Sequence, residues 1–527
     1  MLNSYVFLIF TSMKKLPIGI QSFSEIRKGG YVYVDKTELV HRMVTMGKPY
    51  FLSRPRRFGK SLLVSTLKEL FEGNKPLFEG LWIEEHWDWE QRYPVLHFSF
   101  DAMDYEQSGL EGALSRALAG RANQLGMGIR HSNYKARFNE LITAAHEKYG
   151  QVVLLIDEYD KPIIDYLSAE SMAQAKANRD ILREFYGVIK SADTQLRLVF
   201  ITGITKFSKV SIFSHLNNLN DLTLDRNYAT LTGYTQQELE HYFADHLEVT
   251  RETLGITMEA LLDNMRVWYN GYSWDGKARL YNPFGILNFL SKQQFANFWF
   301  ATGSPNFLIE QMRERQLFAV ENMEVSNIVF EQFDLDYVAP VSLLFHAGYL
   351  TVKSVDVMTG EYVLDYPNKE VRESMYQFLI DELAPEQGHR HTGRTIRDMR
   401  QAFIDGDLEQ VRQILNSILA GLPYETFDAK SEGLYHGLVH IVFNYLGIYA
   451  DSETHSSRGR ADAIVQTLDT VYIFEFKFGE SAEAAVAQIR ERGYADRYRS
   501  SGKRILGIGV GFDAAQREIG GWKVAEL

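Results

Sequence analysis

The sequence contains no cysteine, and this absence excludes several kinds of chemistry. Disulfide bonds, thiolate zinc sites, iron–sulfur clusters and a cysteine nucleophile are ruled out, and a chain without disulfides fits a reducing, cytoplasmic location. Long apolar runs are also absent: the longest near the start, residues 5–10, is far shorter than the roughly 18 residues needed to cross a bilayer. We therefore expect no membrane-spanning segment and no membrane partner.

Basic residues are too few to coat the molecule in positive charge. The chain has 56 Lys and Arg against 68 Asp and Glu, a net charge of −12, which disfavours a general nucleic-acid coat but permits a local basic groove. Its 527 residues predict about three folded domains. Residues 1–12 lack the basic region and the cleavage site of a secretory signal, and we interpret them as an N-terminal extension.

From residue 50 to about 225, short β-type runs alternate with helical stretches, which is typical of βαβ units around a parallel sheet. The predicted class of this region is therefore α/β. The predicted strands are 50–52, 95–98, 152–156 and 196–201, and the predicted helices are about 60–72, 107–126, 135–149 and 171–191.

The segment 54–61 follows the first predicted strand and matches the phosphate-binding pattern G-x-x-x-x-G-K-[ST] except at its first position. Gly59 and the following helix can present backbone N–H groups to phosphates, Lys60 can reach the outer phosphates, and Ser61 can ligate magnesium. The alternative is an Arg-rich surface turn before an ordinary helix. The loop also offers guanidinium groups suited to phosphate, those of Arg54, Arg56 and Arg57.

Two carboxylates stand at the end of the apolar run 152–156. We expect Asp157 to hold magnesium and Glu158 to polarise an attacking water. Thr202 and Thr205, just past the fourth predicted strand, are candidates for sensing the outer phosphate. Together with the loop, this pair predicts a P-loop NTPase with ATP and Mg²⁺ as its cofactors.

A second constellation of charged residues lies near the C-terminus. Asp462 stands on one β-type run, and Glu475 and Lys477 stand on the next, where strand alternation directs both side chains to the same face. Two carboxylates and a lysine among apolar neighbours are costly to bury unless a metal or mutual pairing compensates them. We expect Asp462 and Glu475 to ligate Mg²⁺ and Lys477 to position or activate water for phosphodiester cleavage. The alternative is an exposed Glu–Lys pair on an amphipathic strand.

Two flanking segments bear on this prediction. A helix upstream carries Glu432, His436 and His440 on one face, so that Glu432 could point at the metal. The two histidines could instead indicate zinc, but no spaced third ligand accompanies them. Downstream, a basic stretch fits either a phosphate-facing surface or a solvated helix face, with six basic residues, Arg490, Arg492, Arg497, Arg499, Lys503 and Arg504, against Glu491 and Asp496.

Composition and pattern divide the chain into five parts. A cap-like Thr235 to Glu238 box opens an aromatic, helical segment that resembles a lid. The predicted parts are the extension 1–12, a P-loop domain 13–230, a helical lid 231–300, a middle domain with linker helices 301–422, and a terminal α/β domain 423–527.

The motifs of the first 350 residues resemble those of bacterial AAA-ATPase-like proteins, and those of the last hundred resemble the PD-(D/E)XK nuclease domain that accompanies that ATPase. The N-terminal motifs are 33–37, 53–61, 156–162, 202–210, 216–218, 268–272, 281–283 and 348–350. The C-terminal motifs are 432–436, 459–462, 474–477 and Gln488.

The resemblance implies a restriction-endonuclease-like terminal domain and a set of site residues. Gln488 matches the helical glutamine of the nuclease core, and residues 35–37 are expected near the nucleotide base. Arg54 departs from the general phosphate-loop consensus but agrees with this family. The implied nuclease residues are Glu432, Asp462, Glu475, Lys477 and Gln488, and the implied nucleotide residues are Lys60, Ser61, Asp157 and Glu158.

The sequence thus predicts an ATP-binding and ATP-hydrolysing domain coupled to magnesium-dependent cleavage of DNA, with the nucleotide state gating cleavage. The alternative is a nucleotide-dependent switch or scaffold whose nuclease-like domain is catalytically silent and only binds nucleic acid or protein. A homo-oligomer stays open as a further form of association.

Overall fold

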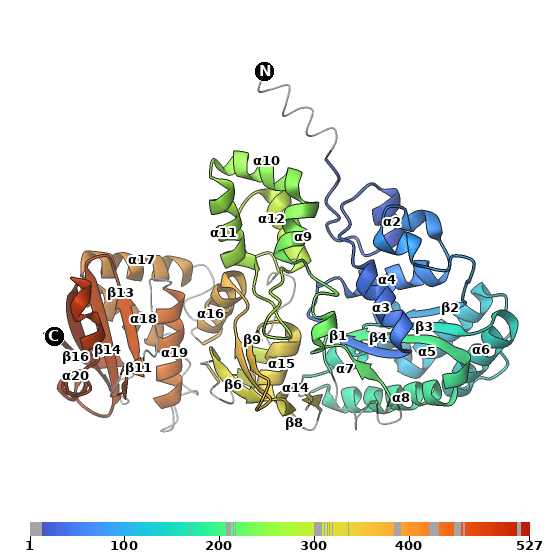
Figure 1. Ribbon diagram of the computed structural model, residues 1–527. Coiled ribbons are helices and arrows are strands. Elements are labelled where there is room, and N and C mark those ends of the chain that lie inside the picture. Colours follow the sequence, from blue (N-terminus) through green and yellow to red (C-terminus); the bar gives the residue numbers. More distant parts are fainter. Residues whose placement is uncertain are drawn as a thin grey trace, which may run out of the picture. The chain divides into compact units, whose positions relative to one another are not determined.

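The computed structural model divides into two compact units (Figure 1). Unit 1 comprises Met1–Phe307 and Glu321–Val371, and unit 2 comprises Leu308–Val320 and Arg372–Leu527. The predicted middle domain, residues 301–422, is therefore divided between them, and the extension 1–12 lies outside the described residues. The described residues are 13–168, 170–206, 212–213, 216, 218–299, 308–309, 311–312, 315, 317–318, 320–331, 333–335, 337–383, 392–420, 432–446, 455–456, 459–513 and 518–527.

Unit 1 is built around a parallel sheet with the strand order β2-β3-β4-β1-β5. The strand before the phosphate loop, β1, and the strand before the two carboxylates, β3, flank β4, as in a P-loop NTPase. The four predicted strands are confirmed, and the short β5 was not predicted. The strands are β1 (Pro49–Ser53), β2 (Val95–Ser99), β3 (Val152–Asp157), β4 (Leu196–Gly203) and β5 (Asn220–Asp221).

Helices cover both faces of this sheet (Figure 1). On one face, Val153 and Leu155 of β3 pack in one cluster with Leu67 of α4. On the other face, Phe138 of α6 stacks on Phe185 of α8 at 4.3 Å between ring centroids. The four predicted helices are confirmed among α2 (Phe23–Lys28), α3 (Thr37–Met46), α4 (Lys60–Phe71), α5 (Tyr105–Gln124), α6 (Tyr134–Tyr149), α7 (Lys161–Ile164) and α8 (Met172–Ser191).

The remainder of unit 1 is a helical segment followed by a small antiparallel sheet. The Thr235 side chain accepts from the Glu238 backbone N–H and Glu238 reciprocates, so the predicted capping box is confirmed. The helices are α9 (Gln236–Tyr242), α10 (Ala244–Leu254), α11 (Met258–Tyr269), α12 (Pro283–Lys292), α14 (Ile328–Glu331) and α15 (Pro340–Ala347). The strands are β6 (Met323–Ser326), β7 (Phe333–Asp334), β8 (Tyr337–Val338), β9 (Thr351–Asp356) and β10 (Glu361–Asp365).

Unit 2 contains a four-stranded sheet with the order β13-β14-β15-β16. The helix-strand-strand-helix-strand order is as predicted, whereas β16 was missed because Gly520 and Gly521 interrupt its β-type pattern. The strands are β11 (His455–Ser456), β12 (Gly459–Arg460), β13 (Ala463–Gln466), β14 (Thr470–Phe478), β15 (Arg504–Asp513) and β16 (Glu518–Glu526). The helices are α16 (Lys369–Leu383), which begins in unit 1, α17 (Thr392–Asp405), α18 (Leu408–Ala420), α19 (Glu432–Tyr445) and α20 (Ala482–Glu491).

Glycines let α20 lie close against the unit 2 sheet. A Cβ on Gly509 of β15 would come within 2.0 Å of the carbonyl oxygen of Ala482, the first residue of α20. Because Gly509 pairs with Glu475 of β14, this close packing brings α20 next to the predicted nuclease residues. Over the part of the chain that the structure describes, no helix combines the length and apolar character needed to cross a bilayer.

Candidate nucleotide and nuclease sites

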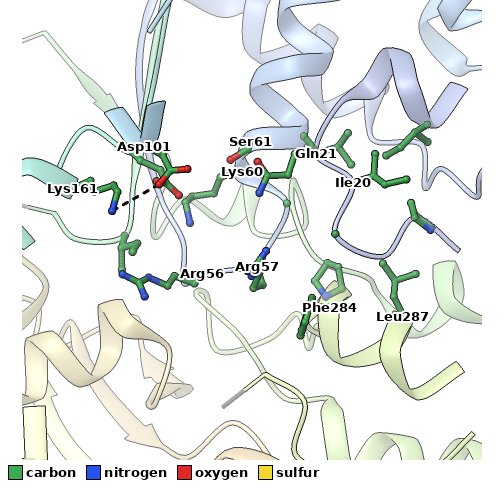
Figure 2. A pocket seen from close by; sticks show the side chains of 18 of the residues that line it. Ile20, Gln21, Arg56, Arg57, Lys60, Ser61, Asp101, Lys161, Phe284 and Leu287 are labelled. Carbon is green, nitrogen blue, oxygen red and sulfur yellow. Dashed lines mark ion pairs between the residues drawn. The ribbon is translucent and has the colours of Figure 1, made fainter. Parts of the chain in front are cut away.

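A cavity of about 340 Å³ opens beside the phosphate loop of unit 1. Asp101, Lys161 and Lys60 gather at one end of it, and Phe284 and Leu287 lie at the other (Figure 2). A charged end and an apolar end are what a nucleotide needs for its phosphates and its base.

The phosphate loop turns sharply before α4. Gly59, the N-cap residue, has φ 89°, a left-handed conformation that glycine adopts without strain. The Lys60 ammonium donates to the carbonyl oxygens of Arg54 and Pro55 at 2.8 and 2.9 Å, so this side chain lies along the loop. Burial lowers the pKa of Lys60, and the nearby carboxylates of Asp157 and Glu158 oppose that shift.

Magnesium chemistry fits the residues at the ends of β3 and α4. The Ser61 hydroxyl hydrogen-bonds to the Asp157 carboxylate, whose pKa is nevertheless raised by burial. Among the described residues, Oδ1 of the 4% exposed Asp157 has no hydrogen-bond partner. A hydroxyl and a carboxylate oxygen are the hard ligands that Mg²⁺ takes beside nucleotide phosphates, and bound there the ion would neutralise phosphate charge.

Glu158 lines the cavity one residue beyond Asp157. Its backbone has φ 53°, which is uncommon for a residue with a side chain and marks a constrained turn. Burial first, and then the charge of Asp157, raise the pKa of Glu158. This position, beside Ser61 and Asp157 and open to the cavity, suits a group that orients water.

The three loop arginines do not share one role. Arg56 and Arg57 line the cavity, and their role as phosphate donors stays a prediction. Arg54 is fully buried, and its guanidinium donates to the carbonyl oxygens of Ser53 and Thr223. The expectation that Arg54 offers its guanidinium to phosphate is therefore wrong, because these oxygens already occupy it.

The apolar end of the cavity was not found from the sequence. It is lined by Ile20 as well as Phe284 and Leu287 of α12 (Figure 2). Residues 35–37, which the family resemblance places near the base, do not line this cavity. Asp35 instead accepts from the Thr37 and Trp82 backbone N–H groups, and Lys36 pairs with Glu238 at 2.5 Å.

Neither of the two threonine candidates near the end of β4 lines the cavity. The Thr205 hydroxyl donates to Asp160 at 2.6 Å, so it is tied to a buried carboxylate and does not line the cavity. Thr202 is fully buried at the end of β4. Asp101 and Lys161, which the sequence analysis did not select, line the charged end and pair with each other at 3.8 Å.

In unit 2, strand pairing brings the predicted nuclease residues together. Ala463 of β13 pairs with Phe474 of β14, so the neighbouring Asp462 lies beside Glu475. Oδ2 of Asp462 accepts from the Phe476 backbone N–H at 2.8 Å, which fixes the carboxylate against β14.

Gln488 of α20 connects the two charged side chains of β14. Its side-chain N–H donates to Oε1 of Glu475, and its Oε1 accepts from the Lys477 ammonium at 2.7 Å. Lys477 also lies 3.7 Å from Oε1 of Glu475. Tyr494, which the sequence analysis missed, shares a hydrogen bond with the same glutamine side chain.

The burial of Glu475 and Lys477 tests the alternative of a surface pair. The Glu475 side chain is 4% exposed and that of Lys477 23%, so the alternative of an exposed Glu–Lys pair is wrong. Burial, and next the charge of Asp462, raise the pKa of Glu475 to about 8. Among the described residues, its Oε2 has no hydrogen-bond partner. This donor set fits a hard divalent cation, which when bound would stabilise charge at a scissile phosphate.

Comparisons with known proteins agree with this geometry. A family model described as "Predicted AAA-ATPase" matches residues 17–213, and one described as "PD-(D/E)XK nuclease superfamily" matches residues 430–522. The "Uncharacterized protein in vnfD 5'region" of Azotobacter chroococcum mcd 1 is 40% identical over 536 aligned residues, covering 98% of this chain and 100% of that protein. The chain belongs to this family of AAA-ATPase-like proteins with a PD-(D/E)XK nuclease-superfamily domain.

A solved structure gives a weaker likeness. The ORC2 protein of Aeropyrum pernix, in its ADPNP-ADP complexes, is 14% identical, with 66% of this chain and 93% of that one covered and a TM-score of 0.27. That score adds nothing to the assignment, which rests on the strand order and on the family models.

The predicted upstream helix is only partly described. Glu432 begins α19, but its side chain and that of His436 lie outside the described residues. Over the described residues, no three His, Asp or Glu side chains gather as a metal site. The basic stretch is mostly exposed, and contacts with acidic or carbonyl oxygens are made by members that include Arg490, Arg499, Lys503 and Arg504.

Proposed function

We propose that this AAA-ATPase-like protein binds and hydrolyses Mg·ATP in unit 1 and cleaves DNA phosphodiester bonds with Mg²⁺ in unit 2. The observation that carries the nuclease half is the network of Glu475, Lys477 and Gln488, with Asp462 beside it and a buried carboxylate oxygen left without a partner. A structural ion pair alone would leave no such oxygen for a cation.

Hydrolysis in unit 1 would use the residues around the charged end of the cavity. Lys60 would leave the loop carbonyls for the outer phosphates, and Arg56 would add a guanidinium there. Glu158 would orient the water. The apolar end between Ile20 and Phe284 suits a purine ring.

A nucleic-acid backbone, DNA in this proposal, fits unit 2 because a mostly exposed basic stretch begins in the last turn of α20 and continues beyond it. The stretch begins at Arg490, two residues beyond Gln488, and Tyr494 within it hydrogen-bonds to Gln488. Phosphate-facing arginines that close to the carboxylates would hold a backbone over Glu475 and Lys477.

Coupling between the two activities is supported by one path within unit 1. The Trp299 indole N–H donates to the carbonyl oxygen of Arg56 in the phosphate loop at 3.1 Å. The Trp299 backbone N–H donates to Glu370 at 2.5 Å, and Glu370 lies in the first turn of α16. Since α16 continues past Val371 into unit 2, a shift of the loop can bias this helix.

A cleavage assay with supercoiled plasmid tests the proposal. The purified chain is incubated with MgCl₂, with or without ATP, beside two variants that each lose one carboxylate. Glu475→Gln should abolish nicking, whereas Glu409→Gln, which removes an exposed α18 carboxylate paired with Arg412, should not change it. Equal nicking by Glu475→Gln and the unchanged chain would contradict the nuclease assignment. ATP binding with no nicking under any metal would favour the silent switch or scaffold.

A further inference from the structure

The phosphate loop carries an arginine where the consensus has its first glycine, and this arginine has an unusual environment. Arg54 is 0% exposed and forms no ion pair within the described residues. Its guanidinium lies 3.9 Å over the Trp274 ring and donates to the carbonyl oxygens of Ser53 and Thr223 at 2.8 and 2.9 Å. A buried guanidinium held by carbonyl oxygens and an indole face is fixed in one orientation.

The backbone of Arg54 does not need glycine. The left-handed residues of the loop are Arg57, with φ 66°, and Gly59, with φ 89°. Arg57 is therefore the strained residue, and its guanidinium lies 5.2 Å over the Phe284 ring. Backbone strain of this kind persists only when surrounding contacts hold it, so the conformation of the loop depends on the side chains that pack against it.

Contacts from later segments hold this loop at successive residues. Trp274, which supports Arg54, also packs edge-on against Phe58, with ring centroids 5.2 Å apart. A Cβ on Gly348 would lie 2.6 Å from Pro55, so α15 ends directly against the loop. The carbonyl oxygen of Arg54 itself accepts from Lys60.

We propose that Arg54 is a positioning residue for nucleotide binding: seated on Trp274, it sets the path of the phosphate loop and the starting place of Lys60. This inference rests on the proposed ATP binding and adds a residue to it. Movement of Arg54 would displace the two carbonyl oxygens that hold Lys60 and release the strained turn at Arg57. In this loop, side-chain contacts of Arg54 would set the backbone path at the position where the consensus loop has its first glycine.

Three variants of the full chain test this assignment. Arg54→Gly restores the consensus sequence, and Arg54→Lys keeps the charge but loses the planar fork. Arg197→Met is the control, since Arg197 also lies over aromatic rings, 5.7 Å from that of Phe71, and donates to the Val44 carbonyl oxygen, yet does not line the cavity. For each, the Kd for ATP in MgCl₂ is measured by calorimetry and the melting temperature is measured without nucleotide.

We expect Arg54→Gly and Arg54→Lys to weaken ATP binding about tenfold or more, and Arg197→Met to lower the melting temperature with an unchanged Kd. An unchanged Kd in Arg54→Gly or Arg54→Lys would overturn the assignment. An equal increase in the Kd for ATP in Arg197→Met and in Arg54→Lys would also overturn the assignment.

If neither Arg54 variant folds, Trp274→Phe decides, because it keeps a ring under Arg54 but weakens the cation–π contact. Weaker ATP binding by folded Trp274→Phe supports the assignment, and an unchanged Kd overturns it. Failure of the unchanged chain to bind ATP would instead contradict the proposed function, so the two failures are distinct.

Discussion

The Lys60 ammonium lies 2.8 Å from the carbonyl oxygen of Arg54, six residues earlier in the same loop. The Lys60 ammonium, which would bind the phosphates, is therefore held by carbonyl oxygens of the phosphate loop. A bound triphosphate would replace these two neutral carbonyl acceptors with charged oxygens, which are stronger partners of an ammonium group.

Removal of this cation should weaken nucleotide binding. Lys60→Met is expected to raise the Kd for Mg·ATP about 10- to 100-fold, since a hydrogen bond to a charged group contributes about 1.5–3 kcal/mol. Calorimetric titration measures it. Lys135→Met is the control, because Lys135 forms an exposed pair with Glu184 and does not line the cavity. Equal Kd values for both variants would contradict this role of Lys60.

The Trp299 indole should carry the response of cleavage to ATP. Trp299→Phe removes the N–H that donates to Arg56 and keeps an aromatic ring, so basal nicking should persist while its dependence on ATP falls. Trp89→Phe is the matched control, because its indole also donates to a backbone carbonyl oxygen, that of Glu84, at 2.8 Å. The same ATP response in Trp299→Phe as in the control would exclude this path.

Metal binding in unit 2 should depend on pH. The folded-state pKa of Glu475 is raised to about 8, so below that pH its carboxyl is mostly protonated and a metal must displace the proton. Affinity for Mn²⁺ without nucleotide should therefore rise up to about tenfold per pH unit between pH 6 and 8 and level off above. Calorimetry measures it, and Glu475→Gln should remove the slope. A pH-independent affinity in the unchanged chain would refute the prediction.

The same shift affects stability, with a definite sign. The Glu475 pKa is raised on folding, so the folded state holds this proton more tightly than the unfolded chain does. Between pH 4.5 and about 8 the carboxyl ionises in the unfolded chain but stays largely protonated in the folded state, and this difference lowers the free energy of unfolding. Without metal, unit 2 should lose stability as pH rises through that window. Denaturant unfolding of the unchanged chain and of Glu475→Gln measures it, and the variant should show the smaller loss.

Close packing of α20 should be sensitive to one methyl group. Gly509→Ala places a Cβ 2.0 Å from the Ala482 carbonyl oxygen, so α20 must shift and carry Gln488 away from Glu475. We expect destabilisation of about 1–3 kcal/mol together with reduced nicking. Gly393→Ala in α17, where a Cβ meets no described atom within 4 Å, should not lower either quantity. Equal melting temperatures for both variants would contradict the close approach.

Local signals in the sequence were sufficient for much of the fold and of both sites. The strand before Asp157 and the loop around Lys60 are contiguous patterns, and Glu475 and Lys477 share a face because strands alternate. The burial of the Arg54 side chain could not be predicted from local pattern, because its partner Trp274 lies in a segment distant in sequence. Ile20 was missed for the same reason: the apolar end of the cavity forms only when α12 packs over it.

Tyr494 shows a related limit. A single tyrosine in a basic stretch carries no sequence pattern, and its contact with Gln488 arises only after α20 and the following turn have packed on the sheet. Spacing therefore identified the charged residues of the candidate nuclease site and the family resemblance added Gln488, whereas Tyr494 became visible only in the structure.

The most direct measurement is plasmid nicking by the purified chain and its Lys477→Ala variant in MgCl₂, with ATP binding measured on the same samples. Because Lys477 contacts Glu475 and Gln488, the variant should lose metal-dependent nicking and keep the Kd for ATP of the unchanged chain. Nicking that survives in Lys477→Ala would contradict the nuclease site.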